Sequence, residues 1–273
     1  MHASLKPVFL FDIDGTLLSV KKDFSRPFIQ RCLASAGIGA ADLDHSTFAG
    51  RTDRDIFLSI VNRHEHSSNL HRTDPEAFAA RAEGTMPDNT PAGNGFPQPD
   101  MNTRIEQQYD TLKSIYIEQL NSELQPEHVT VFDGVLESID YCINNDIPIA
   151  LLTGNFRETA FVKLNRAGLD RYFSRGSFGC DDTDRNRLAI RAVELSKTWY
   201  GQRVDPSRLV VIGDTPRDIG CARHAGLHAV AVATGHYRRN DLAQHQPDLL
   251  LDGLHQPEKW IKACLEQVGG NIQ

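Results

Sequence analysis

Short and mostly apolar runs recur along the chain and predict the strands of a sheet. A continuous apolar run of this kind is typical of a strand that is buried on both faces, as in a parallel sheet. The runs are Val8–Phe11, Ile147–Leu152, Leu209–Ile212, Ala229–Ala233 and the weaker Leu249–Leu251.

Helical periodicity separates the later runs. Apolar residues recur at helical spacing before Gly168 and before Gly226, and glycine is the usual residue just past a helix end. Alternation of strands and helices predicts an α/β fold with a doubly wound parallel sheet. Right-handed crossovers place the carboxyl ends of all strands at one edge, where such sheets bind ligands.

The region from about residue 20 to residue 130 lacks this alternation, and its patterns predict helices only. The expected helices are Phe28–Ala36, Asp53–Arg63, Pro75–Glu83 and Tyr109–Leu120, the last with an apolar stripe that packs against other helices. Gly84–Asn102 has no periodicity, and a loop of that length suggests a lid. We therefore predict an α/β core of residues 1–20 and 130–273, with an all-helical cap domain of residues 21–129 inserted after the first strand.

Charge and composition narrow the class of partner. The chain has 36 acidic and 29 basic residues and a net charge of −7, which disfavours nucleic acid and anionic membranes. No apolar stretch is long enough to span a bilayer. The five cysteines are scattered without a CxxC pair, which is typical of reduced thiols. We expect a cytoplasmic protein that acts as a monomer or a homodimer.

Chemically active residues follow the ends of the predicted strands or, in the case of Arg185, begin the helix that precedes one of them. Because these ends meet at one edge, they predict a cluster of carboxylates, a hydroxyl, an amide and a guanidinium. Carboxylates without thiols or imidazoles favour Mg²⁺. One carboxylate can attack phosphorus, a second can protonate the leaving oxygen, and the remaining groups can hold the phosphoryl oxygens. The residues are Asp12, Asp14, Thr153, Gly154, Asn155, Arg185, Asp214 and Asp218.

Three of these segments resemble motifs of the haloacid dehalogenase-like phosphohydrolases, in that family's order. They are Phe11–Thr16 (FDIDGT), Thr153–Asn155 (TGN) and Gly213–Asp218 (GDTPRD). The chain looks most like the phosphoglycolate-phosphatase-like members with a type-1 helical cap.

The resemblance implies a role for each matching residue. Asp12 would be the nucleophile, and Asp14 the general acid/base that also offers its backbone carbonyl to Mg²⁺. Asp12 and Asp214 would bind the metal, and Asp218 would support the metal through a water molecule or through contacts with its ligands. Thr153, Gly154 and Asn155 would bind the phosphoryl group.

Three positions leave alternatives open. The family usually has a lysine at its third motif, where this chain offers Arg185, with Arg187 as the second choice. Asp218 also suits a helix cap with Thr215. Arg51 could bind a substrate carboxylate, although Thr52 and Asp55 predict a simple capping box.

The leading hypothesis is a Mg²⁺-dependent phosphatase that acts on a small phosphorylated metabolite through an aspartyl-phosphate, with phosphoglycolate suggested by the resemblance. A phosphomutase for a sugar phosphate would use the same nucleophile and acid/base. A signalling receiver also carries a phosphorylatable aspartate, but an acid/base and a large cap would not serve it.

Overall fold

The computed structural model describes residues 6–39, 47–72, 99–200 and 204–268. Six strands form a parallel sheet in the order β5-β4-β1-β6-β7-β8, which confirms the predicted fold class. The strands are β1 (Val8–Phe11), β4 (Ile149–Leu152), β5 (Gly176–Ser177), β6 (Leu209–Gly213), β7 (His228–Val232) and β8 (Leu249–Leu251).

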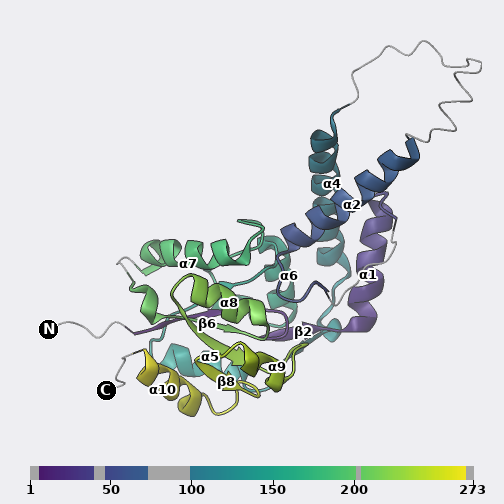
Figure 1. The fold of residues 1–273 in the computed structure, drawn as a ribbon. Coiled ribbons are helices and arrows are strands. Elements are labelled where there is room, and N and C mark those ends of the chain that lie inside the picture. The colour runs from purple at the N-terminus through teal and green to yellow at the C-terminus, as the bar shows by residue number, and fades with distance from the viewer. Residues whose placement is uncertain (1–5, 40–46, 73–98, 201–203, 269–273) are drawn as a thin grey trace, which may run out of the picture.

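Helices cover both faces of this sheet (Figure 1). Successive strand residues point to opposite faces, so Phe9 and Phe11 pack in one apolar cluster and Val8 and Leu10 in the other. The first cluster includes residues of α5 (Val135–Asn144), α6 (Arg157–Arg166) and α10 (Pro257–Gln267). The second includes residues of α7 (Arg185–Tyr200), α8 (Pro216–His224) and α9 (Arg239–Gln244).

The predicted elements of the core agree closely with the structure. Val8–Phe11 and Leu249–Leu251 are strands with the predicted bounds, and Gly168 and Gly226 follow helix ends with φ of +68° and +72°. Strand β5 was not predicted, because two small residues give no apolar run. Short 3₁₀ helices precede or follow several strands: η2 (Pro126–His128), η3 (Asp170–Tyr172) and η4 (Pro206–Arg208).

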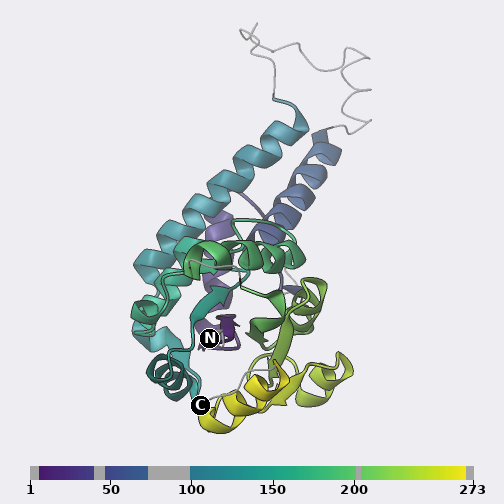
Figure 2. The ribbon, with the colours of Figure 1, turned by 90° about the vertical axis from the view of Figure 1, so that its left-hand side faces the viewer.

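Within the described residues, three cap helices project from the carboxyl-end side of the sheet: α1 (Lys22–Ser35), α2 (Asp53–Arg72) and α4 (Met101–Glu123) (Figure 1 and Figure 2). Two strands that the sequence did not reveal, β2 (Leu18–Val20) and β3 (Val129–Val131), pair antiparallel where the chain leaves and re-enters the core. This ribbon lies beside the predicted boundaries at residues 21 and 129, which remain a prediction.

Two predictions for the cap fall mainly on residues that the structure does not describe. The expected helix Pro75–Glu83 lies outside the described residues, as does the expected loop from Gly84 to residue 98. The predicted end of that loop at Asn102 was wrong, because Asp100 caps α4 and the helix already begins at Met101. A polar N-cap side chain followed by helix formers explains this earlier start.

The cap has an apolar cluster of its own. Leu33 of α1, Val61 of α2 and Leu112 of α4 are fully buried in it, and Phe156 of the core joins them. None of the helices in the described ranges is both long and apolar enough to cross a membrane. The expectation of a monomer or a homodimer remains a prediction.

Candidate active site

The residues singled out in the sequence lie at the carboxyl edge of the sheet, around a cavity of about 550 Å³ between the core and the cap helices. Asp12, Asp14, Gly154, Asn155, Arg185 and Asp214 line this cavity. Thr153 and Asp218 stand directly behind the lining and are buried. The structure thus brings together segments that are up to two hundred residues apart.

Three buried carboxylates form the centre of the site. Asp12 follows β1, Asp214 follows β6, and Asp218 lies in the first turn of α8. Each offers an oxygen within 4.8 Å of the others. Among the described residues this is the one such group of acidic, histidine or cysteine side chains with metal-ligand spacing.

Gly15 and Gly235 leave free the space that the carboxylate of Asp214 occupies. A Cβ atom on Gly15 or on Gly235 would overlap this carboxylate. Thr16 also donates a hydrogen bond of 3.3 Å from its hydroxyl to Asp214 Oδ1. Gly15 has a φ of +85°, which other residues rarely adopt, so the DGT sequence serves backbone geometry as well as chemistry.

Burial makes this cluster a strong candidate for a cation site. Burial raises the pKa of Asp12 to about 6, although Arg185 opposes the shift. The pKa of Asp214 lies well above its ordinary value because of burial and the adjacent carboxylates of Asp218 and Asp12. Buried acids of this kind are stabilised in their charged form by a bound cation, and an all-oxygen donor set suits Mg²⁺.

Arg185 is the cation inside the cluster. Its guanidinium lies 3.1 Å from Asp12 Oδ2, also pairs with Asp218 Oδ1, and donates to the carbonyl of Gly50 at 3.3 Å. Burial disfavours its charge, but the carboxylates outweigh burial and raise its pKa. Arg187, the second choice from the sequence, is 72% exposed at its side chain and lies 3.7 Å from Asp182.

Asp218 uses both carboxylate oxygens within the protein. Oδ1 pairs with Arg185, and Oδ2 accepts hydrogen bonds from the backbone N–H and the hydroxyl of Thr215 at 3.0 and 2.7 Å. The capping arrangement considered in the sequence analysis is therefore present. Oδ1 of Asp218 has one protein partner and Oδ2 has two, so a direct metal bond from Asp218 would come from Oδ1.

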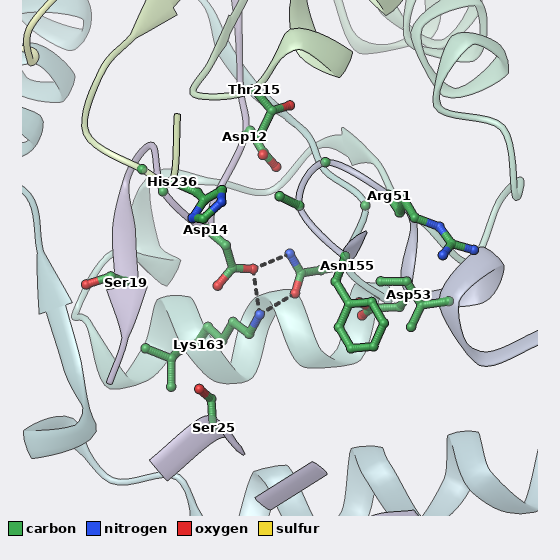
Figure 3. A pocket seen from close by; sticks show the side chains of 18 of the residues that line it. Asp12, Asp14, Ser19, Ser25, Arg51, Asp53, Asn155, Lys163, Thr215 and His236 are labelled. Atoms are coloured by element: carbon green, nitrogen blue, oxygen red, sulfur yellow. Dashed lines mark hydrogen bonds and ion pairs between the residues drawn. The ribbon is translucent and has the colours of Figure 1, made fainter. Parts of the chain in front are cut away.

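A second cation, Lys163 of α6, was missed by sequence reasoning. Its ammonium lies 2.6 Å from Asp14 Oδ2 and 2.5 Å from Asn155 Oδ1, as Figure 3 shows. Burial would lower its pKa, but Asp14 and Asp53 raise it. The signal was the spacing of four residues between Asn155, Thr159 and Lys163, which places Thr159 and Lys163 on one face of α6 directly after Asn155.

The side chain of Asn155 links Thr153 to the ion pair between Asp14 and Lys163. Its amide nitrogen donates to Asp14 Oδ2 at 2.8 Å and to Thr153 Oγ1 at 2.9 Å, while its oxygen accepts from Lys163. The side chain of Asn155 is therefore occupied by protein partners. Because Thr153 accepts this hydrogen bond, its own O–H stays available as a donor.

The segment Gly50–Asp53, called the docking segment here, holds the cap against the core. The backbone N–H of Asp53 donates to the carbonyl of Gly154 at 2.7 Å, and Thr52 donates its hydroxyl to the carbonyl of Thr183 at 3.0 Å. A Cβ atom on Gly154 would overlap the carbonyl oxygen of Arg51. Glycine at this motif position therefore serves the close approach of the cap.

Asp53 itself caps the first turn of α6. Its Oδ2 accepts from the backbone N–H of Phe156 at 2.9 Å and lies 3.5 Å from the hydroxyl of Thr159. Burial raises its pKa to about 6, with Lys163 and the Phe156 N–H acting in the opposite direction. A carboxyl group of the cap thus becomes part of a core helix terminus.

Arg51 is held within the cap. Its guanidinium bonds Asp55 Oδ2 at 2.6 Å and the hydroxyl of Ser59 at 2.5 Å, and Figure 3 shows it pointing away from Asp12 and Asp14. Thr52 Oγ1 accepts from the N–H of Asp55 at 3.1 Å, as the capping alternative requires.

Comparison with known proteins places these features in context. A family model described as a haloacid dehalogenase-like hydrolase matches residues 6–226. A phosphoglycolate phosphatase of Agrobacterium fabrum is 24% identical over 91% of this chain and 89% of its own length. The pyrophosphatase PpaX of Bacillus pumilus is 26% identical over 92% of this chain and 94% of its own length.

Solved structures share the fold at low sequence identity. A predicted phosphoglycolate phosphatase from Haemophilus somnus has a TM-score of 0.63 at 17% identity, covering 96% of this chain and all of that one. The β-phosphoglucomutase of Clostridium difficile has a TM-score of 0.60 at 15% identity, covering 97% and 98%. At this identity the likeness concerns the fold alone.

Proposed function

Since the chain belongs to the haloacid dehalogenase-like hydrolase family, we propose that it is a Mg²⁺-dependent phosphatase that hydrolyses a small phosphomonoester. The observation that carries this proposal is the position of Asp12. It lies in the cavity beside a buried arginine, within a cluster of buried carboxylates, and two residues before a more exposed carboxylate.

Asp12 is the nucleophile in this proposal, and Asp14 is the general acid/base. A carboxylate oxygen of Asp12 attacks phosphorus, while Asp14 gives a proton to the departing alcohol oxygen. Asp14 then takes a proton from the water that attacks the aspartyl-phosphate, and Asp12 is restored. Asp14 suits this exchange because its side chain is 42% exposed, whereas that of Asp12 is 7% exposed.

Arg185 and Thr153 are the groups that would bind the phosphoryl oxygens. Arg185 already lies beside Asp12, so its N–H groups are placed to meet charge that develops on an adjacent phosphoryl group. Thr153 is oriented by Asn155 and has a hydroxyl proton to donate. Gly154 lines the same cavity, so its backbone can contact the phosphoryl group.

Asp12 and Asp214, with the backbone carbonyl of Asp14, would hold Mg²⁺, and Asp218 would orient Arg185 beside them. When bound, the cation supplies positive charge that lets these acids ionise and reduces their repulsion of the substrate phosphate. The four carboxylates of the site face two protein cations, Arg185 and Lys163, so a divalent cation brings their charges to balance.

The direct test is the Asp12→Asn variant with p-nitrophenyl phosphate and Mg²⁺. We expect activity to fall by at least about a thousandfold, since the amide is a poor nucleophile. Asp110→Asn, an exposed carboxylate on α4, is the matched control and should retain full activity. Full activity of Asp12→Asn would disprove the proposed mechanism.

The acceptor of the phosphoryl group needs a separate assay. Incubation with a hexose phosphate should release inorganic phosphate if water is the acceptor. Isomerisation without release of phosphate would instead identify a phosphomutase.

A further inference from the structure

Aromatic rings from three cap helices line the cavity that contains Asp12. Phe24 and Phe28 of α1, Phe57 of α2 and Tyr116 of α4 belong to this lining, and we call these four the ring wall. Neighbouring rings in the wall are in direct contact, with centroids 5.3 Å apart for Phe24 and Phe28, 5.5 Å for Phe28 and Tyr116, and 5.1 Å for Tyr116 and Phe57. The ring wall is thus a continuous run of packed rings, in which Phe28 and Phe57 are 2% exposed and Phe24 is partly exposed.

The cations deep in the same cavity already have partners. Lys163 pairs with Asp14, Arg185 pairs with Asp12, and Arg51 pairs with Asp55. Two further basic residues of the lining, Lys22 and His236, are exposed to solvent. Two basic side chains touch the ring wall from outside the cavity lining: Arg31 lies over the Phe28 ring and pairs with Glu123, and the partly buried His128 stacks on Phe24.

This distribution of charge discriminates between substrates. A carboxylate or a second phosphate placed against the ring wall would lose its water, and the basic residues of the lining, which are paired with acids or exposed to solvent, would compensate this loss only in part, which is unfavourable. An uncharged ring placed there would leave water and stack against other rings, which is favourable. A cavity of about 550 Å³ also offers far more room than a two-carbon acid uses.

Building on the proposed phosphatase function, we infer that the preferred substrate is a phosphomonoester whose alcohol carries an uncharged aromatic ring. The phosphate lies at Asp12, and the ring of the leaving alcohol packs against the ring wall. The cap thereby selects against phosphoglycolate and pyrophosphate.

The first experiment compares esters of primary alcohols, because leaving groups of similar basicity make the chemical step comparable. We expect kcat/KM for 2-phenylethyl phosphate to exceed that for ethyl phosphate and for phosphoglycolate by at least about tenfold, as burial of one aromatic ring implies. Equal or higher kcat/KM for phosphoglycolate would overturn the inference.

A space-filling variant tests the location of the ring. Ser25 of α1 also lines the cavity, so Ser25→Phe should lower the ratio of kcat/KM for phenylethyl over ethyl phosphate by at least about tenfold. Gln30→Phe, at an exposed position of the same helix outside this lining, should leave that ratio unchanged. An unchanged ratio in Ser25→Phe would place the ring elsewhere and contradict the inference.

A binding measurement tests this inference independently of the proposed function. Calorimetry with the Asp12→Asn protein and Mg²⁺ should give tighter binding of 2-phenylethyl phosphate than of phosphoglycolate. If no ester is hydrolysed by the unaltered protein, the proposed function fails, and this order of affinities still decides the inference. Tighter binding of phosphoglycolate would refute the inference alone.

Discussion

The core side and the cap side of the cavity differ in how their side chains are held. On the core side, Arg185 pairs with Asp12 and Lys163 pairs with Asp14, so each cation is fixed by a buried or partly buried partner. On the cap side, the ring wall offers apolar contact area without fixed charges. Reaction chemistry needs a fixed geometry, whereas apolar packing tolerates changes of shape, so the two sides suit catalysis and substrate selection respectively.

The docking segment joins these two sides through backbone contacts. Asp53 and Gly154 bond across the interface, and Gly50 accepts from Arg185. Movement of the cap would therefore also affect the position of the Arg185 guanidinium. Variants that disturb one side at a time can separate their contributions.

Among the variants that disturb one side of the cavity, Gly235→Ala on the core side is expected to have the largest effect on activity. The added Cβ would overlap Asp214 and must displace its carboxylate. We expect apparent Mg²⁺ affinity and kcat/KM to fall by about 10- to 100-fold for every substrate, as measured by Mg²⁺ titration of activity. Gly220→Ala is the control, because no atom lies within 4 Å of its Cβ position. An unaltered Mg²⁺ requirement in Gly235→Ala would argue against Asp214 as a ligand.

A smaller effect is expected at the interface, from Gly154→Ala. The added Cβ would collide with the carbonyl of Arg51 and push the docking segment away from the core. We expect kcat/KM to fall by about tenfold, together with faster hydrogen exchange at the Asp53 amide.

Gly39→Ala is the matched control in the cap, since its Cβ position is open. Loss of activity in Gly154→Ala without faster exchange at Asp53 would indicate a direct effect on the phosphate site. The comparison of the two sides would then need revision.

The smallest effect on activity is expected from Asp53→Asn, which changes the pH dependence of stability. Burial raises the pKa of Asp53 to about 6, above its unfolded value of about 3.9, so the folded protein favours the protonated form. Its contribution to stability is full below about pH 4 and is lost as the pH rises through about 6.

The neutral amide of Asp53→Asn does not titrate. The stability of the unaltered protein relative to this variant should therefore decrease by on the order of 1–2 kcal/mol between pH 4 and pH 7, measured by urea unfolding. Asp110→Asn should show no such trend. A difference between Asp53→Asn and the unaltered protein that stays constant with pH would mean that Asp53 is not buried against α6.

Several site positions could be expected from sequence because they depend on local pattern. A run of apolar residues followed by an acidic residue predicts both a buried strand and the edge of the sheet at which the acid lies. Asp12 and Asp214 were predicted in this way. Their roles in catalysis remain predictions. Lys163 could not be assigned in this way, since its pairing with Asp14 depends on how α6 packs beside β1.

The structure was also needed to choose between competing explanations for one residue. Asp218 fits a helix cap and a metal site equally well in sequence, and the structure shows its oxygens bound to Thr215 and Arg185. Tyr109–Leu120 was expected to pack against other helices, which it does, but Tyr116 and Leu120 also line the cavity. Periodicity shows that a face is buried without showing whether a helix or a cavity covers it.

The sequence alone determined the alternation of the five longer apolar strands with helices in the core, the edge of the sheet that carries the acids, and the family resemblance. These depend on short-range periodicity and on the handedness of the chain, which local residues encode. Only the tertiary structure decided which cation pairs with which carboxylate, why Gly154 and Gly235 are glycines, and that aromatic rings line the cavity. Those features depend on distances between segments far apart in the chain, which are set by packing between helices, strands and loops.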